Sequence, residues 1–350
     1  MFIRNAWYVA AWADELDERP LGRTILGEPV VLFRDANGQP AALQDFCKHR
    51  GAPLSAGRVT GAGLECGYHG LVYAGDGRCV RIPGQTHIPE RAGTRSYPLV
   101  EKDACLWIWM GDAAAADPAE ILDFPYHSDR KWPHKHTMYP VAGNATLLID
   151  NLMDLTHLGY VHATTIGGNP SAHVDAKTDV KTTEHGVKFT RWLLDIPAAP
   201  TIRKAVPELG ETIDRWQEFE FIAPACIVQW SGSVDANTGA YDKGKRDGGF
   251  QARLFHAITP ETEESCHYFW SGANGYRIDD PQATEDLFSE LCRAFDQDMA
   301  MIAAQQQRIA TFGEDGLVNI VADASRVHMR RVLERMAAAE RTPPREAATV

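Results

Sequence analysis

Residues 47–54 read CKHRGAPL, and residues 66–73 read CGYHGLVY. Each stretch begins with a Cys–His pair, and sixteen residues separate His49 from Cys66. Thiolate sulfur and imidazole nitrogen are ligands for soft and borderline metals, including zinc and iron. The side chains of Cys47, His49, Cys66 and His69 therefore predict a metal centre, and this centre decides how the surrounding chain must fold.

Two kinds of centre are open on the ligands alone. Two cysteines and two histidines can bind one structural zinc ion tetrahedrally. They can also hold a [2Fe–2S] cluster, in which the cysteines ligate one iron and the histidines ligate the other. Glycines follow both pairs, at Gly51 and Gly70, and there the main chain can approach the ligand sulfurs closely.

Composition limits the class of protein. The chain has 350 residues, enough for two domains with buried cores. Its net charge of -12 argues against a nucleic-acid partner, because phosphate attraction needs clustered positive charge. No run of apolar residues is long enough to predict a membrane span. Seven cysteines, an odd number, do not suggest a disulfide scaffold and favour a cytoplasmic location.

The pattern of strands and turns divides the chain into two parts. Short apolar runs separated by Gly-rich turns predict a small β domain over residues 1–112. Residues 113–350 then form a second domain, with helical spacing over 146–160 and strands such as 186–192 and 266–270. A long helix is expected from about residue 281 to 311, opened by an acidic pair and Pro281, and the tail 337–350 is expected to be frayed.

A second candidate site lies in residues 150–162, which read DNLMDLTHLGYVH. His157 and His162 are five residues apart, a spacing that Gly159 could adapt by loosening the turn. Asp154 precedes His157 by three residues and shares its helical face. A polar helix surface is the alternative interpretation of these residues. A two-histidine site for redox-active iron also needs a carboxylate ligand.

Asp298 is the candidate for that ligand, because it falls on an apolar stripe of the late helix, between Phe295 and Ile302. A buried carboxylate needs a cation or strong donors. On geometry alone, a metal ion and a buried ion pair with arginine remain equal alternatives.

The flanks of both sites resemble the Rieske oxygenases, and more narrowly the vanillate O-demethylase oxygenase group, which includes dicamba and toluenesulfonate methyl monooxygenases. The resemblance rests on both Cys–His segments and on residues that read NAWYVA (5–10), NLMDLTH (151–157), YVH (160–162), ITPETE (258–263) and FDQDMAMIAAQQ (295–306). Lys48 stands where proline is usual in the group, and Gln297 stands where glutamate is common.

The resemblance implies an α+β chain. An N-terminal all-β Rieske [2Fe–2S] domain is followed by a helix-grip (START-like) catalytic domain with an antiparallel sheet and a long C-terminal helix. It also implies that the [2Fe–2S] cluster is held by Cys47, His49, Cys66 and His69, and that a mononuclear Fe(II) is held by His157, His162 and Asp298.

Further roles follow from the same resemblance. Asp154 would link His69 of a neighbouring subunit to His157 across a head-to-tail homotrimer, and Asn151 would lie beside the iron. For the substrate pocket, the candidates are His256, Gln229 and Ser289. His256 matches a position that contacts a substrate carboxylate in the dicamba enzyme.

The implied function is a terminal oxygenase that removes the methyl group of a methoxylated aromatic acid with dioxygen and releases formaldehyde. NAD(P)H would supply electrons through a separate flavin- or ferredoxin-type reductase, because the chain has no convincing dinucleotide-binding fingerprint. One alternative is hydroxylation of a methyl or ring carbon of another aromatic compound. An alternative of another class is a Rieske electron carrier without oxygenase activity.

Overall fold

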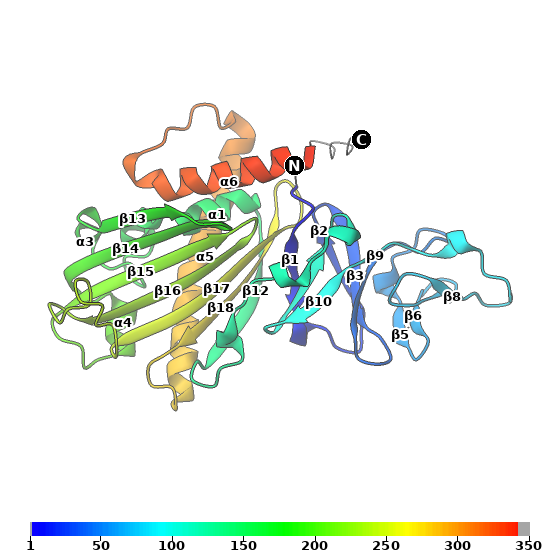
Figure 1. Ribbon diagram of the computed structural model, residues 1–350, viewed down its shortest axis with the longest axis horizontal. Helices are drawn as coiled ribbons and strands as arrows, with labels where there is room; N and C mark the ends of the chain where they lie inside the picture. Colours follow the sequence, from blue (N-terminus) through cyan, green and yellow to red (C-terminus); the bar gives the residue numbers. More distant parts are fainter. Residues whose placement is uncertain (1, 342–350) are drawn as a thin grey trace, which may run out of the picture. The chain divides into compact units, whose positions relative to one another are not determined.

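The computed structural model describes residues 2–341, which form two compact units (Figure 1). Contacts assign Met1–Asp123 and Thr259–Glu263 to the first unit, and Phe124–Ile258 and Glu264–Val350 to the second. The first unit extends past residue 112 because the following segment stays attached to it. The Trp7 indole donates to the Asp117 carbonyl at 2.8 Å, and the Lys102 ammonium donates to the Ile121 carbonyl at 2.8 Å.

The first unit consists of small antiparallel sheets. Its described strands form a three-stranded sheet of order β1-β11-β10 and two four-stranded sheets of order β2-β3-β4-β9 and β5-β6-β7-β8. The strands are β1 (Trp7–Trp12), β2 (Leu21–Ile25), β3 (Glu28–Arg34), β4 (Pro40–Gln44), β5 (Arg58–Thr60), β6 (Gly63–Glu65), β7 (Val72–Tyr73), β8 (Cys79–Arg81), β9 (Ser96–Tyr97), β10 (Leu99–Lys102) and β11 (Cys105–Trp109).

The second unit is built on one seven-stranded sheet of order β12-β18-β17-β16-β15-β14-β13. The strands are β12 (His134–Val141), β13 (Lys177–Thr182), β14 (Gly186–Pro197), β15 (Thr212–Ile222), β16 (Cys226–Asp235), β17 (Phe250–Pro260) and β18 (Cys266–Asn274). The strand pairs β12–β18, β13–β14, β14–β15, β15–β16 and β16–β17 are antiparallel, and the register of β14 with β15 shifts between Leu193 and Ile196. Alternating residues of these strands therefore share one face of the sheet.

The helices follow the same division. The α-helices are α1 (Ala145–Met153), α2 (Leu158–Val161), α3 (Ser171–Val174), α4 (Pro200–Ala205), α5 (Pro281–Phe312) and α6 (Ala324–Arg341). The short 3₁₀ helices are η1 (Ala13–Glu15), η2 (Leu54–Ala56), η3 (Glu90–Ala92), η4 (Ala113–Ala115), η5 (Pro118–Glu120), η6 (Pro125–His127), η7 (Leu155–His157) and η8 (Val321–Asp323).

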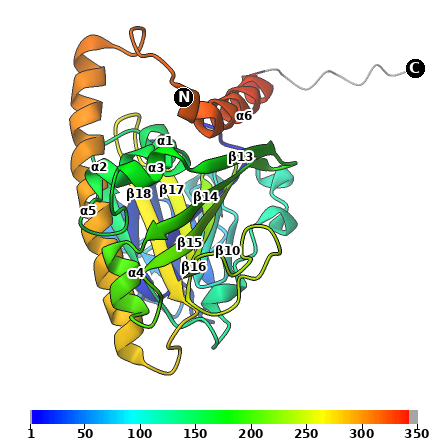
Figure 2. The same ribbon diagram turned by 90° about the vertical axis from the view of Figure 1, so that its left-hand side faces the viewer.

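Helix α5 runs along one face of the seven-stranded sheet and closes its core (Figure 2). The rings of Phe288 and Phe295 pack against Trp270 of β18, with centroids 5.0 and 4.8 Å away. Gly272 of the same strand gives the helix room, since a Cβ there would lie 2.6 Å from a methyl group of Leu291. The predicted long helix is confirmed, and the side chain of Asp280 caps its first turn by accepting from the Gln282 amide at 3.0 Å.

The predicted single helix over residues 146–160 is wrong in detail. Helix α1 ends at Met153, and Asp154 has extended backbone (φ -129°, ψ 107°) before η7 and α2 begin. The Asp154 carboxylate accepts from the Thr156 amide at 2.9 Å and caps the new turn. Helix α1 therefore ends before Asp154, and Gly159, which was expected to loosen the turn between His157 and His162, lies inside α2.

The predicted fraying of the tail is wrong for residues 337–341, which continue α6, and the remaining residues 342–350 lie outside the described part. The α+β fold class is confirmed: an all-β unit precedes a large antiparallel sheet that is closed by a long helix. None of the described helices is long and apolar enough to cross a membrane.

Candidate active site

The two Cys–His pairs lie in two matching turns of the first unit. After β4, the amide of Gly51 donates to the Cys47 carbonyl at 2.8 Å, and after β6 the amide of Gly70 donates to the Cys66 carbonyl at 3.0 Å. Both glycines have positive φ angles, 72° and 71°, which side chains with a Cβ disfavour. Each turn can therefore present one cysteine and one histidine in the same way.

The cysteines point inward and the histidines outward. Cys47 and Cys66 are buried in the core of the first unit, whereas His49 and His69 are exposed and their ring centroids are 4.4 Å apart. Among the described residues, these four side chains do not converge on one point, as the ligands of a single metal ion would. Two inner thiolates and two outer imidazoles fit a binuclear [2Fe–2S] cluster better than a single tetrahedral zinc ion.

Tyr73 supports the inner half of this site. Its hydroxyl lies 3.1 Å from the Lys48 amide, which donates to it, and 3.3 Å from the Cys47 sulfur. Because the amide occupies the hydroxyl oxygen, the hydroxyl proton is free to point to the sulfur. Hydrogen bonds to ligand sulfurs help to set the potential of such clusters.

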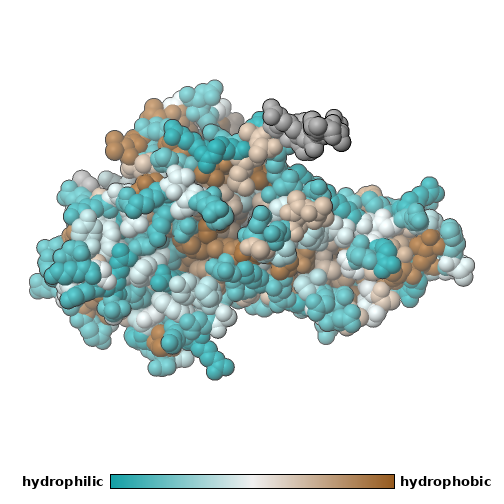
Figure 3. Space-filling model, in the orientation of Figure 1, coloured by the Kyte–Doolittle hydropathy of each residue, from teal (hydrophilic) through white to brown (hydrophobic). Residues whose placement is uncertain are grey.

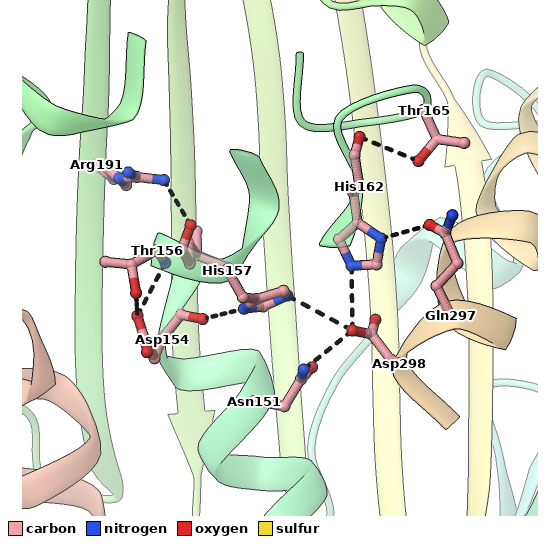
Figure 4. Close-up of polar contacts among 10 residues, drawn as sticks. Asn151, Asp154, Thr156, His157, His162, Thr165, Arg191, Gln297 and Asp298 are labelled. Atoms are coloured by element: carbon pink, nitrogen blue, oxygen red, sulfur yellow. Dashed lines mark hydrogen bonds and ion pairs between the residues drawn. The ribbon is translucent and has the colours of Figure 1, made fainter. Parts of the chain in front are cut away.

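His157, His162 and Asp298 come together in the second unit, and one ligand atom from each lies within 4.8 Å of the others. Figure 4 shows both imidazoles directed at the Asp298 carboxylate. Nε2 of His162 lies 3.1 Å and Nε2 of His157 lies 3.6 Å from Oδ1 of Asp298. His157 ends η7 and His162 directly follows α2, so the two histidines lie at the two ends of one short turn and not on one long helix.

The second nitrogen of each ring is held by the protein. Nδ1 of His157 lies 2.7 Å from the main-chain carbonyl of Asp154, and Nδ1 of His162 lies 2.9 Å from Oε1 of Gln297 (Figure 4). Both Nδ1 atoms therefore act as donors, and the lone pairs of both Nε2 atoms point to the shared centre. A tautomer held in this way is the usual support for metal-binding histidine.

Charge and burial suit a cation at this point. Burial lowers the pKa of His157 and keeps the ring neutral, which is the ligand form. Burial also lowers the pKa of His162, but the hydrogen bond and charge of Asp298 outweigh it and leave that pKa raised. Asp298 is itself buried. Two imidazoles and one carboxylate, facing a cavity, are the donor set of non-haem Fe(II) oxygenases.

Asn151 completes the polar side of the centre. Its side-chain amide donates to Oδ1 of Asp298 at 3.0 Å, while its buried Oδ1 finds no partner among the described residues. The side chain lines the cavity that reaches the centre. An unpaired acceptor next to the proposed ligands fits a site that takes up a further group there.

The cavity beside the centre lies within the second unit, between the sheet and the helices that carry the ligands. Most of its wall is apolar, including Leu155, Phe219, Leu254 and Phe295. Such a lining excludes water and suits an aromatic ring.

The three predicted pocket residues have different positions. Gln229 lines the cavity. His256 is fully buried behind the wall, where its two nitrogens contact the Tyr268 hydroxyl and Gln229. Ser289 is exposed on α5 and does not line the cavity.

Two cavity residues are missing from the sequence analysis, namely Arg215 and Gln217 of β15. The signal was present in the alternation of this strand. Ile213, Phe219 and Phe221 share one face with them and belong to the core. An arginine and a glutamine at core positions of a strand need a reason, because uncompensated burial of polar groups is costly.

Comparisons with known proteins agree with this geometry. Residues 6–98 match the model of the Rieske [2Fe–2S] domain, and residues 141–339 match that of the vanillate O-demethylase oxygenase C-terminal domain. The iron–sulfur subunit of a toluene-4-sulfonate monooxygenase system from Comamonas testosteroni is 39% identical over 97% of this chain and 98% of its own length. A vanillate O-demethylase oxygenase subunit from a Pseudomonas species is 36% identical over 97% of this chain and 96% of its own.

Among solved structures, dicamba monooxygenase bound to 3,6-dichlorosalicylic acid matches with a TM-score of 0.92 and 34% identity, over 97% of this chain and 99% of that one. These matches cover both units. The chain therefore belongs to the vanillate O-demethylase oxygenase family and is the oxygenase component of a Rieske monooxygenase that works with a separate reductase.

Proposed function

We propose that this oxygenase removes the methyl group of a methoxylated aromatic acid and releases formaldehyde. The observation that carries the proposal is the convergence of His157, His162 and Asp298 beside an apolar cavity, in a chain that also has both Cys–His turns. Relatives named as vanillate and dicamba O-demethylase oxygenase components support the substrate class.

The ligand assignment belongs to the proposal. Cys47, His49, Cys66 and His69 would hold the [2Fe–2S] cluster, and His157, His162 and Asp298 would hold Fe(II). When bound, the cluster supplies electrons singly and the Fe(II) supplies dioxygen activation.

The remaining work is done by this chain. The apolar wall excludes water and orients the methoxy group toward the centre. Gln297 and the Asp154 carbonyl keep both imidazoles in the ligand tautomer. Asn151 donates one amide proton to Asp298, and its amide oxygen, unpaired within residues 2–341, remains available to a group bound in the cavity.

A second reaction is supported by the relative from the toluene-4-sulfonate system, which is 39% identical to this chain. Hydroxylation of a methyl group on an aromatic sulfonate needs the same two centres. Because a methyl ether yields formaldehyde and a C-methyl group yields an alcohol, the product distinguishes the two reactions.

The partners remain predictions. We propose a flavin- or ferredoxin-type reductase that carries electrons from NAD(P)H, a cytoplasmic location and a head-to-tail homotrimer, in which Asp154 links His157 to the partner subunit's His69. An exposed apolar loop between α5 and α6 supports an assembly (Figure 3). Its most exposed large apolar residues, with the last residue of α5, are Phe312, Leu317, Val318, Ile320 and Val321.

The domain division is part of the same proposal. Residues 1–112 would act as the electron-transfer domain and residues 113–350 as the catalytic domain. The two family matches fall entirely on either side of this boundary, which supports it.

His157→Ala tests the proposed function. We expect the variant to keep the visible absorbance of the cluster, to lose mononuclear iron, and to lose formaldehyde formation from methoxybenzoates by at least about 1000-fold, because one of three metal ligands is gone. Iron analysis, absorbance and formaldehyde assays with a reductase measure the three effects. His185→Ala, at an exposed position in the same unit, is the matched control. Unchanged formaldehyde formation in His157→Ala would contradict the assignment.

A further inference from the structure

Arg215 and Gln217 lie on the core face of β15, in the middle of an apolar stripe. Arg215 is 5% exposed and Gln217 is 2% exposed, and both line the cavity that reaches His157, His162 and Asp298. Apart from the residues around the metal centre, the polar side chains of the wall are Thr201, Arg215, Gln217, Gln229 and Ser231, and Arg215 is the cation among them.

The Arg215 guanidinium has no anionic partner within residues 2–341. Its Nη1 donates to the Ile166 carbonyl at 2.9 Å, and its buried Nε has no hydrogen-bond partner there. Burial and the nearby charge of Arg191 lower the pKa of Arg215 to about 10, so the group is still a cation at neutral pH. A buried cation without a counter-ion is unstable.

Arg191, on the neighbouring strand β14, is a buried arginine whose guanidinium is hydrogen-bonded within the chain. It lies opposite Gln217 in the register of β14 and β15. Its guanidinium donates to the Leu155 carbonyl at 2.9 Å and contacts His173 at 3.0 and 3.1 Å. Arg191 is therefore held by the chain, whereas the Nε edge of Arg215 is left for something else.

The neighbours of Arg215 are also left incomplete. Oε1 of Gln217 and Oγ of Ser233 are buried without partners in the described chain. Ser233 faces Arg215, and Ser231 faces Gln217, in the register of β15 and β16. A half-turn of the Gln217 side-chain amide exchanges its oxygen and nitrogen. Gln217 can therefore equally direct its N–H groups into the cavity. Three unpaired polar groups then meet on two strands.

His256 is a poor alternative for binding an anion. Nε2 donates to Oε1 of Gln229 at 3.1 Å, and Nδ1 lies 2.7 Å from the Tyr268 hydroxyl, which donates to it. Burial lowers the pKa of His256 to about 3. The ring is therefore neutral, already paired on both sides, and separated from the cavity by Gln229.

We propose that Arg215, assisted by Gln217, binds the anionic carboxylate or sulfonate group of the aromatic substrate and so turns the other end of the ring to the metal centre. This inference rests on the proposed function and names the group that selects its substrate. A planar guanidinium can hold an oxoanion through two parallel N–H donors. The carboxylate or sulfonate of the substrate would then be the counter-ion of the Arg215 guanidinium.

Binding to the intact holoenzyme tests the proposal without turnover. The probes are benzoate and benzenesulfonate, each compared with its neutral amide, and titration calorimetry measures the affinities. We expect the wild type to prefer the anions, and Arg215→Gln to bind them about 10- to 100-fold more weakly with little change for the amides. Arg253→Gln is the control, because Arg253 stacks over Trp230 and does not line the cavity.

A second variant places the counter-ion in the strand. Gln217→Glu puts a carboxylate on the same face as Arg215, so it should weaken binding of both anions while leaving the binding of the amides unchanged. A merely structural role of Arg215 does not predict this loss. Equal affinity of the wild type for benzoate and benzamide, failure of both anions to bind, or unchanged discrimination in Arg215→Gln overturns the proposal.

A turnover assay separates this proposal from the proposed function. Formaldehyde from 3-methoxybenzoate that disappears with Arg215→Gln supports both proposals. Arg215-dependent binding of the anions without formaldehyde from any methoxybenzoate leaves the anion site standing and removes the O-demethylase proposal. Equal formaldehyde formation from 3-methoxybenzoate and 3-methoxybenzamide, unchanged in Arg215→Gln, would support the O-demethylase proposal and exclude the anion site.

Discussion

The second nitrogen of each histidine in the triad is held by an acceptor of a different kind. His157 donates to a main-chain carbonyl, which no side-chain substitution removes. His162 donates to the neutral side-chain amide of Gln297, next to Asp298 in the chain. Because Gln297 replaces a glutamate common in the group that the chain resembles, its partner role can be tested directly.

Gln297→Leu removes the acceptor and frees the His162 ring to rotate. We expect iron to bind about 10- to 100-fold more weakly, as is usual when the outer partner of a metal-binding histidine is lost. Competition with a chelator for Fe(II), followed by iron analysis, measures the change. Gln297→Glu is the matched control, because a carboxylate keeps the hydrogen bond. An iron affinity in Gln297→Leu equal to that of the wild type would show that this contact does not support the site.

At the scale of elements, the position of the segment that carries His157 depends on how α1 is anchored. Asp150, near the end of α1, pairs with Arg330 and Arg326 of α6, at 2.9 and 3.1 Å. Ser325 also donates its hydroxyl to the Met153 carbonyl. Helix α6 therefore holds the last turn of α1, immediately before the break that positions His157.

Asp150→Ala should release α6 and destabilise the second unit by about 2 kcal/mol, between the effects of surface and buried ion pairs. Two arginines lose their shared partner, and only part of their charge can reach water. Urea unfolding measures the free energy, and limited proteolysis between α5 and α6 reports the release. Arg331→Ala, on an exposed position of the same helix, is the control. Identical unfolding curves for Asp150→Ala and wild type would exclude the anchoring role.

At the scale of the whole molecule, the buried histidines link stability to pH. The folded-state pKa of His256 is about 3, against an ordinary value of 6.5. Below pH 6.5, His256 therefore binds a proton in the unfolded chain but not in the folded chain. The stability that depends on neutral His256 is complete above this pH and is lost as the pH falls toward the folded-state pKa.

We expect stability to fall by about 1.4 kcal/mol per pH unit from this group alone, well below its ordinary pKa. His173, whose pKa burial lowers to about 4, changes stability in the same direction. Denaturant unfolding at several pH values from about 5 to 7 measures the slope. In His256→Asn the slope should become shallower by the contribution of one group. A slope that does not change would mean that His256 is protonated in the folded protein.

The trimer proposal makes a prediction at the same scale. Asp154→Ala should keep both metals, because the His157 ring donates to the main-chain carbonyl and not to the carboxylate. Turnover with the reductase should nevertheless fall by at least about 10-fold, a rise of about 1.4 kcal/mol in the activation barrier. Asp154→Asn, which keeps the capping geometry, separates loss of the cap from loss of the charge. Wild-type turnover in Asp154→Ala would exclude the proposed electron bridge.

Local chemistry in the sequence was enough to predict the two Cys–His turns, the long helix with its acidic start and Pro281, and the burial of Asp298. In each case a ligand type, a capping side chain or a periodicity has the same meaning in any fold. The alternation of residues 213–221 could have placed Arg215 and Gln217 on the core face of a strand, but the sequence analysis did not single them out.

Only the tertiary structure decided the rest. From the sequence alone, Asp298 could pair with an arginine or bind a metal ion. The pairing of β14 to β18 under α5 places Asp298 beside His157 and His162 rather than beside Arg191 or Arg215. The same pairing leaves Arg215 without an anionic partner among residues 2–341 and places His256 next to Gln229. Contacts between residues distant in the chain depend on strand order and register, and neither is written in a local pattern.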